Sequence, residues 1–497
     1  MAVAKNQNDR IIFGLKVKQL RQAKGLSFSD LSKGCGLSIS YLNEIEKGKK
    51  YPKVDKIRDL AKALDTAEEE LTDLKLSGSL APVGDLLRSN FLNELPLDLF
   101  GIELAKVIEI IANAPLRVGA FISTLVDLSR NFSLREENFY HGALRSYQEM
   151  HYNYFESIEE AALRFSAQYK IPTDGSVSVH LLADILQECF GYKIIENGLV
   201  AYPELHHLRS VFVPRKKRLL LNEGLNEIQQ AFQYAKELGF QFLELKERAS
   251  SSSLVKVNSF EEVLNHFKAA YFGVAILINR DSFIVDLQSF FGQAKWDGQA
   301  FLSLMNKYHA SPEMLFQRLT NIIPEFFGLE QMFFLRFKHD PETDDFQIDK
   351  ELHLNRRHHP HGNQINEHYC RRWMSLLLLK DLHQMQSEGK YAGTIVGAQR
   401  SRYFGTEDEY LCLTLARPGA PTPNKNVSVT LGFLINQELK STINFWNDPA
   451  LNQREVHTTC ERCPIEDCHE RAQPALIIEK RNRRRKVEEA IRQIIGD

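Results

Sequence analysis

Three cysteines near the end of the sequence have a spacing that suits metal binding. Cys460, Cys463 and Cys468 follow the pattern Cys-x2-Cys-x4-Cys. Two thiolates two residues apart can chelate one ion, and a third after a short loop closes one face of the site. The spacing therefore predicts a metal site that holds an iron–sulfur cluster or zinc, and it does not by itself choose between them.

A closed site needs a fourth ligand, and the sequence offers several candidates. His469 and His457 lie beside the three cysteines, whereas Cys370 and Cys412 are more distant along the chain. With three cysteines alone, a cluster would keep an open or non-cysteine corner, which suits sensing, whereas structural zinc would require one of these side chains. The seven cysteines do not indicate a disulfide framework, because nothing at the start of the chain suggests secretion.

A second chemical pattern lies near the start, where polar side chains gather on a short predicted helix. Apolar residues recur at helical spacing from Leu26 to Lys47 and are interrupted by a glycine-containing turn. Ser27 is predicted to cap the first helix, with Asp30 completing a capping box, and Gly48 to end the second. This is the plan of a helix-turn-helix, whose second helix lies in the major groove of DNA.

Charge around this motif favours double-stranded DNA as the partner. Residues 1–64 contain 14 Lys and Arg and 6 Asp and Glu, a net charge of +8 (14 − 6), whereas the whole chain carries −2. Neutralising phosphates requires such a basic module. We predict that hydroxyl and amide side chains read base edges and that lysines contact the backbone. The predicted contacts are Ser38, Ser40, Tyr41, Asn43, Lys47, Lys49 and Lys50.

Most of residues 10–74 resemble the DNA-binding domain of phage-repressor-like regulators of the Cro/C1 type. The resemblance rests on the run Leu-Ser-x-Ser-Tyr-Leu-x-x-Ile-Glu-Lys-Gly from Leu37 to Gly48, followed by Pro52. It implies a dimer on paired half-sites. Phe28 stands where this family usually has a glutamine that contacts DNA, so the first helix of the pair is expected to dock differently.

The predicted helix from Gln230 to Phe240 resembles the metal-binding helix of ImmA/IrrE metallopeptidase-like domains, which carries His-Glu-x-x-His. At the two ligand positions this sequence has Lys236 and Phe240, which cannot hold zinc. Glu237 remains, and we expect it to be a structural partner. His266 falls near the expected third ligand, and one histidine does not make a site. We therefore assign no catalytic residue and expect a scaffold rather than an enzyme.

These candidate sites require several domains, because 497 residues exceed the usual size of one. The expected fold is multidomain, mainly α with an α+β C-terminal part. It comprises a five-helix helix-turn-helix domain (1–76), a helical connector (77–147), an inactive metallopeptidase-like domain (148–330) and a sheet-containing sensor domain with the cysteine site (331–497). No apolar run approaches the roughly 18–20 residues of a membrane span, so a cytoplasmic location is expected.

The order of these parts resembles the short-chain fatty-acyl transcriptional regulators. Further likeness lies in Cys370-x-x-Trp373 and in Arg471-Ala-x-Pro474, which follows the three clustered cysteines. The resemblance implies a homodimeric or larger regulator that responds to a small metabolite such as a short-chain acyl-CoA, with an iron–sulfur cluster at the three cysteines in some members. Two alternatives stay open: a metallopeptidase acting on a partner repressor, and a phage-immunity or toxin–antitoxin regulator that binds a protein.

Overall fold

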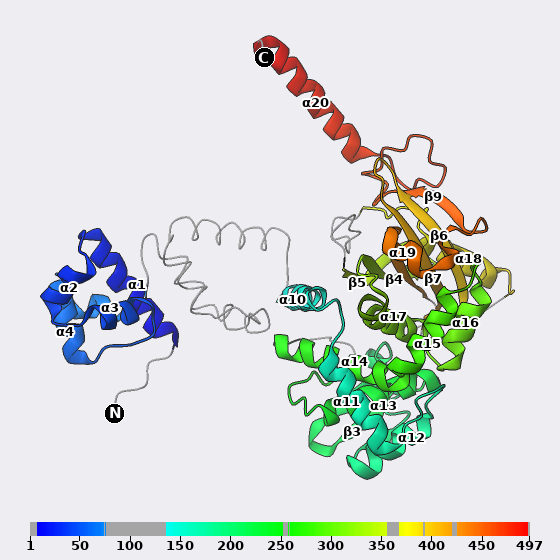
Figure 1. Ribbon diagram of the computed structural model, residues 1–497, viewed down its shortest axis with the longest axis horizontal. Helices are drawn as coiled ribbons and strands as arrows, with labels where there is room; N and C mark the ends of the chain where they lie inside the picture. Colours follow the sequence, from blue (N-terminus) through cyan, green and yellow to red (C-terminus); the bar gives the residue numbers. More distant parts are fainter. Residues whose placement is uncertain are drawn as a thin grey trace. The chain divides into compact units, whose positions relative to one another are not determined.

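The computed structural model describes residues 7–73, 75, 136–251, 257, 259–354, 367–390, 393–419 and 425–495. The chain divides into two compact units, Met1–Ala143 and Leu144–Asp497, and each is described by itself (Figure 1). Most of the predicted connector 77–147 lies outside the described residues. Its last part, from residue 136 onward, is helical and forms the first turns of α10 (Glu136–Met150). No described helix has the length and apolar character that crossing a membrane requires.

The first unit is a small helical domain, as predicted. Within residues 7–73 its helices are α1 (Gln7–Ala23), α2 (Phe28–Cys35), α3 (Ile39–Glu46), α4 (Val54–Ala63) and α5 (Glu68–Thr72). Phe13 and Val17 of α1 pack with Leu42 and Ile45 of α3 in one buried cluster. The two helices meet closely at Gly14, where an added Cβ would lie 2.2 Å from the Ile45 carbonyl oxygen.

The second unit begins with helices around a small sheet. The helices are α11 (Glu156–Tyr169), α12 (Val179–Asp184, followed by a π-helical turn at Ile185–Cys189), α13 (Glu227–Phe242), α14 (Phe260–Leu277), α15 (Arg280–Phe291), α16 (Gly298–Lys307) and α17 (Pro312–Phe327). The strands are β1 (Lys193–Ile195), β2 (Ser210–Val213) and β3 (Arg218–Leu221), in the order β1-β3-β2. β2 and β3 pair antiparallel, and β1 pairs with β3 in parallel.

A larger sheet completes this unit. It comprises β4 (Met332–Asp340), β5 (Asp345–His353), β6 (Ile395–Tyr403), β7 (Glu409–Pro418), β8 (Asn426–Leu434) and β9 (Asn452–Val456), in the order β5-β4-β8-β7-β6-β9. Neighbouring strands run antiparallel except β6 and β9, which pair in parallel. The remaining helices are α18 (Met374–Ser387), α19 (Gln437–Thr442) and α20 (Leu476–Ile495).

The central strands β7 and β8 are buried on both faces, and their alternating side chains enter two different cores. On β7, Leu411 and Leu413 belong to the core that also contains residues of α11 to α17. Tyr410 and Cys412 belong instead to the core under α18. Helices α11 to α17 and one face of the sheet therefore share one hydrophobic core.

Buried ion pairs reinforce this unit. Arg417 of β7 donates to Glu313 at the start of α17, with Nη2–Oε1 at 2.7 Å, and the surrounding guanidinium groups lower the pKa of the Glu313 carboxyl despite its burial. Arg318 of α17 is fully buried and pairs with Glu159 of α11. Arg318 also donates from Nε to the Ile278 carbonyl oxygen at 2.9 Å. These contacts join α17 to β7 of the sheet, to α11 and to the end of α14.

Candidate functional site

Helices α2 and α3 have the local structure that their sequence predicts. The Ser27 hydroxyl accepts the Asp30 backbone N–H at 3.1 Å, and the Asp30 carboxylate accepts the Ser27 backbone N–H at 3.0 Å, so the capping box is complete. Ser38 caps α3 by accepting the Tyr41 backbone N–H at 3.2 Å. Gly48 follows α3 with φ of 68°, a left-handed conformation that favours glycine.

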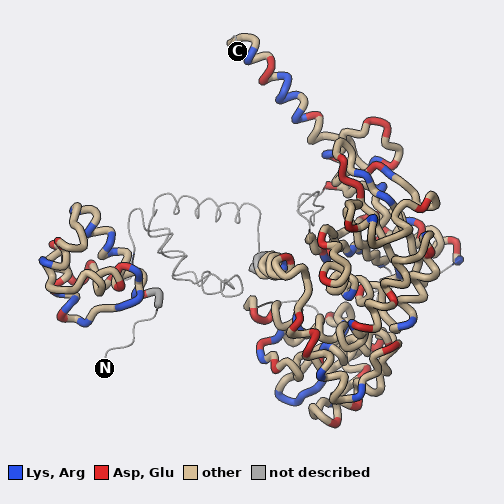
Figure 2. The backbone as a smooth tube through the Cα atoms, viewed as in Figure 1, with Lys and Arg blue, Asp and Glu red and all other residues tan. Residues whose placement is uncertain are grey.

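The structure places the predicted DNA contacts on the surface of α3 and the loop after it. Ser38, Ser40, Asn43, Lys47, Lys49 and Lys50 are exposed, and Tyr41 is half-buried. The hydroxyl of Ser38 is engaged in capping, which leaves Ser40 and Asn43 as polar side chains of α3 with exposed heads. The lysines and arginines of this domain are coloured in Figure 2.

A buried ion pair that the sequence did not reveal sets the position of α3. The Arg21 guanidinium of α1 donates to the Glu46 carboxylate at the end of α3, with Nε–Oε1 at 2.6 Å and Nη2–Oε2 at 2.9 Å. The same guanidinium lies 4.2 Å from the centre of the Phe28 ring. Phe28 therefore packs against the Arg21 side chain that anchors α3.

On α13, Lys236 and Phe240, which stand at the two histidine positions of the His-Glu-x-x-His pattern, are buried and pack together. The Lys236 ammonium donates to Nδ1 of His266 at 3.0 Å, and Nε2 of His266 lies 3.3 Å from the Ala249 carbonyl oxygen. These contacts suit a neutral imidazole with its proton on Nε2. Burial lowers the pKa of Lys236 to about 7, and burial together with the Lys236 charge lowers that of His266 to about 3. The predicted third-ligand histidine thus faces a cation.

Glu237 is held by an arginine from the loop after its own helix. Arg248 donates twice to its carboxylate, with both N–O distances at 2.7 Å, and the Tyr192 hydroxyl donates at 3.0 Å. The Arg248 guanidinium lies 3.8 Å from the centre of the Phe240 ring and 4.2 Å from that of Phe212. Both carboxylate oxygens of Glu237 are therefore engaged, and Phe240 supports the arginine that engages them.

The chain brings a fourth cysteine to the three clustered ones. The backbone before α18 pairs with the loop after β9 at an isolated bridge between Tyr369 and Thr459. The Cys460 N–H donates to the His368 carbonyl oxygen at 2.8 Å, and the Cys370 N–H to the Thr458 carbonyl oxygen at 3.1 Å. This pairing joins segments about ninety residues apart in the sequence and places Cys370 beside Cys460.

Four thiols line one small cavity, contributed by Cys370, Cys460, Cys463 and Cys468. Burial raises the pKa of Cys370 to about 11 and also raises that of Cys463, so both thiols are neutral as they stand. Backbone N–H groups of His457 and Ala472 approach the sulfur atoms of Cys370 and Cys460, at 3.5 and 3.4 Å. Such donors stabilise thiolates in metal centres.

Four thiols are a suitable set of ligands for a metal ion or an iron–sulfur cluster. Their side chains, however, are not arranged as they would be around a bound metal. In the described part of the chain, no three His, Cys, Asp or Glu side chains are already grouped as a metal ion requires. Arg471 holds the loop by donating to the carbonyl oxygens of Cys460, at 2.8 Å, and Cys463, at 3.1 Å. Of the other candidate ligands, Cys412 is buried on β7, and neither His457 nor His469 is among the residues that line the cavity.

Comparison with known proteins identifies the N-terminal domain. Residues 12–74 match the family described as "Helix-turn-helix domain". The control protein C.BamHI of Bacillus amyloliquefaciens is 34% identical over 73 residues, which are 14% of this chain and 90% of that protein. The chain belongs to the helix-turn-helix regulators. The HTH-type transcriptional regulator YazB of Bacillus subtilis (strain 168) is also similar, with 35% identity over 60 residues, 12% of this chain and 87% of that protein.

The second unit of the regulator matches a different family. Residues 187–320, which include α13 and α14, match the "IrrE N-terminal-like domain". A solved structure described as a Mycobacterium tuberculosis transcriptional regulator covers 67% of this chain and 94% of its own, with 18% identity and a TM-score of 0.46. The helix that resembles the ImmA/IrrE-like domains, around Ala235–Gly239, lies within this match. The family match therefore confirms the resemblance.

The sequence did not reveal the side chains of the regulator that pair with residues distant along the chain. Arg248 lies 11 residues after Glu237, beyond the end of α13, where no motif marks it as a partner. The pairing of Arg21 with Glu46 spans 25 residues and two helices. Cys370 was one of several possible fourth ligands in the sequence, and in the structure it lines the same cavity as the other three cysteines.

Proposed function

We propose that the regulator binds double-stranded DNA as a homodimer through α3, and that a metal centre at Cys370, Cys460, Cys463 and Cys468 sets its affinity for the operator. Exposed Ser40 and Asn43 on α3 support base reading, since hydroxyl and amide groups can pair with base edges. Two copies would place their α3 helices on half-sites about 34–36 Å apart.

The observation that carries the sensing part is the convergence of four thiols on one cavity. The donor set suits an iron–sulfur cluster or zinc. A bound cluster would supply a centre that changes with oxidation, whereas zinc would supply a stable cross-link. In either case, the protein's own part is to hold Cys370 against the loop after β9, so occupancy would join the start of α18 to the segment leading into α20.

We infer that the IrrE-like domain is a scaffold in this regulator. The ammonium of Lys236 and the guanidinium of Arg248 stand beside His266 and Glu237, where the related enzymes use a metal cation. Of the two side chains at the zinc-ligand positions, Phe240 packs against the Arg248 guanidinium and Lys236 donates to His266. A small metabolite acting on the sheet domain, for which the family resemblance suggests a short-chain acyl-CoA, would act by binding one state of the dimer more tightly than another.

The proposal is tested on full-length protein purified without oxygen. Elemental analysis and visible absorption would identify the metal, and operator sequences would be selected from random duplexes. Fluorescence anisotropy would then measure DNA affinity before and after metal removal. We expect brown protein for a cluster or colourless protein for zinc, stoichiometric metal, and at least about a tenfold change in affinity, equivalent to about 1.4 kcal/mol.

Serine variants distinguish a four-cysteine site from adventitious metal. Cys370→Ser and Cys460→Ser should lose metal to the same extent, because each removes one ligand of the same centre. Cys412→Ser is the control, since Cys412 is equally buried in the core under α18 without lining the cavity. Full metal content in Cys370→Ser would reject Cys370 as a ligand, and unchanged DNA affinity after metal removal would reject the sensing role.

A further inference from the structure

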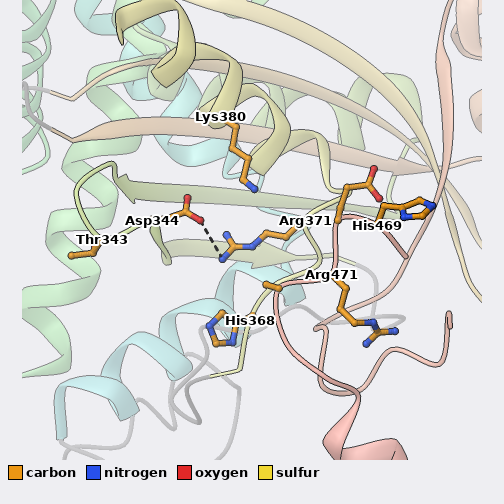
Figure 3. Close-up of a pocket in the computed structure, with 9 residues that line it drawn as sticks. Thr343, Asp344, His368, Arg371, Lys380, His469 and Arg471 are labelled. Atoms are coloured by element: carbon orange, nitrogen blue, oxygen red, sulfur yellow. Dashed lines mark ion pairs between the residues drawn. The ribbon is translucent and has the colours of Figure 1, made fainter. Parts of the chain in front are cut away.

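A second cavity adjoins the cysteine cavity and has a different character. It has a volume of about 430 Å³, within the usual range for small-molecule sites. Seven of its nine lining residues are titratable, so its surface does not suit an apolar ligand. In Figure 3, Lys380 reaches from α18 toward the pair formed by Arg371 and Asp344, with His368 on the other side.

Arg371 is a buried cation whose charge is only weakly balanced by a nearby carboxylate. Its side chain is 9% exposed, and its ion pair with Asp344, whose side chain is 60% exposed, is long at 3.9 Å. The guanidinium also lies 4.3 Å from the centre of the Phe346 ring, which holds it without neutralising it. Because a buried charge is costly unless it is paired, this arrangement favours an anion beside Arg371.

Lys380 adds to the positive charge of the cavity. The Arg471 guanidinium also lines the cavity, but it donates to backbone carbonyl oxygens of the cysteine loop and in Figure 3 points away from Arg371 and Lys380. Lys380 is exposed, and among the described residues no carboxylate pairs with Lys380 or Arg471. Of the two carboxylates in the cavity wall, Glu470 is engaged by Arg372 at 3.1 Å and Arg454 at 2.8 Å.

We propose that this cavity binds a compact phosphate-class anion between Arg371 and Lys380. Guanidinium groups present paired N–H donors that match phosphate oxygens, and the lysine adds a point charge. Arg371, Glu470 and Arg471 line this cavity and the cysteine cavity alike, so the bound anion and the cysteine site would share one wall. The inference rests on the proposed function only in treating this anion as an effector of the regulator.

The test measures binding of inorganic phosphate to the full-length protein by isothermal titration calorimetry, in phosphate-free buffer at constant ionic strength. We expect one saturable site per chain. Lys380→Ala should weaken it about tenfold, because one charge-assisted contact is lost from an exposed position that folding does not require. The matched control is Lys390→Ala, since Lys390 follows the same helix, is exposed and pairs with Glu388 outside the cavity.

A second titration with ribose 5-phosphate distinguishes the source of the phosphate group. Tighter binding than inorganic phosphate would indicate a phosphorylated metabolite, and equal or weaker binding would indicate the free ion. Absence of saturable binding would overturn the proposal, as would equal affinity in Lys380→Ala and wild type, or equal weakening by Lys390→Ala. The measurement uses no DNA, so its failure is separate from failure of the proposed DNA-binding function.

Discussion

Replacing Lys236 with methionine should change how the stability of the second unit depends on pH. Burial lowers the pKa of Lys236 from its ordinary value of 10.5 to about 7. The unfolded chain therefore holds a proton between these values that the folded chain has released, and the stability of the wild type rises with pH across this window because of this group. Below about pH 7 the folded chain carries the full cost of a buried ammonium.

The magnitude follows from the difference of about 3.5 in pKa, which corresponds to about 5 kcal/mol at about 1.4 kcal/mol for each pKa unit. Between about pH 6 and about pH 9.5, roughly 3 kcal/mol of this cost is relieved, because the unfolded lysine is still mostly protonated at the higher pH. Lys236→Met keeps most of the side-chain stem and removes the charge. Its stability relative to the wild type should therefore be about 3 kcal/mol more favourable at the lower pH.

Urea unfolding followed by tryptophan fluorescence provides the assay, since Trp296, Trp373 and Trp446 all lie in the second unit. Measuring the difference between variant and wild type cancels the titration of other groups. Lys390→Met is the control, because that lysine is exposed and should leave the difference independent of pH. If Lys236→Met gives the same difference at both pH values, the ammonium does not carry the cost assigned to it, and the reasoning fails.

Three further predictions concern the DNA-binding domain. Asn43→Ala should cost about 1–3 kcal/mol on the selected operator and little on random DNA, whereas Lys49→Ala should weaken both alike; anisotropy with the two duplexes would show whether base reading is wrongly assigned. Glu46→Gln should destabilise the domain by about 3 kcal/mol, because Arg21 loses its buried partner, and urea unfolding followed by circular dichroism would detect it. Gly48→Ala should cost at least about 1 kcal/mol in the same assay, since φ is 68° and the added methyl group meets α1; a stability equal to wild type would contradict this.

Local chemistry made part of the fold predictable. Ser27 and Asp30 are three residues apart and satisfy each other, so the start of α2 could be predicted from the sequence. β9 was not predicted, because Asn-Gln-Arg-Glu-Val has no apolar alternation and forms a strand only by pairing with β6.

The candidate sites were predictable only where their residues lie close in sequence. The spacing of Cys460, Cys463 and Cys468 marked a site, but the place of Cys370 depends on backbone pairing between distant segments. Lys236 and Phe240 were seen to stand where the resembling metallopeptidases have their two histidines. What replaced them could not be inferred, because the contacts of Arg248 depend on how the loop after α13 folds back.

The parallel pairing of β9 with β6 has a consequence for self-association. β6 would otherwise present an open row of backbone N–H and C=O groups, and such rows recruit strands from other molecules. β9 covers that row with a short strand whose residues are mostly polar or charged, which makes a poor template for further pairing. β9, the strand that leads into the cysteine loop, therefore also protects the edge of the sheet from pairing with other molecules. Proteolysis between α19 and β9 would weaken this protection.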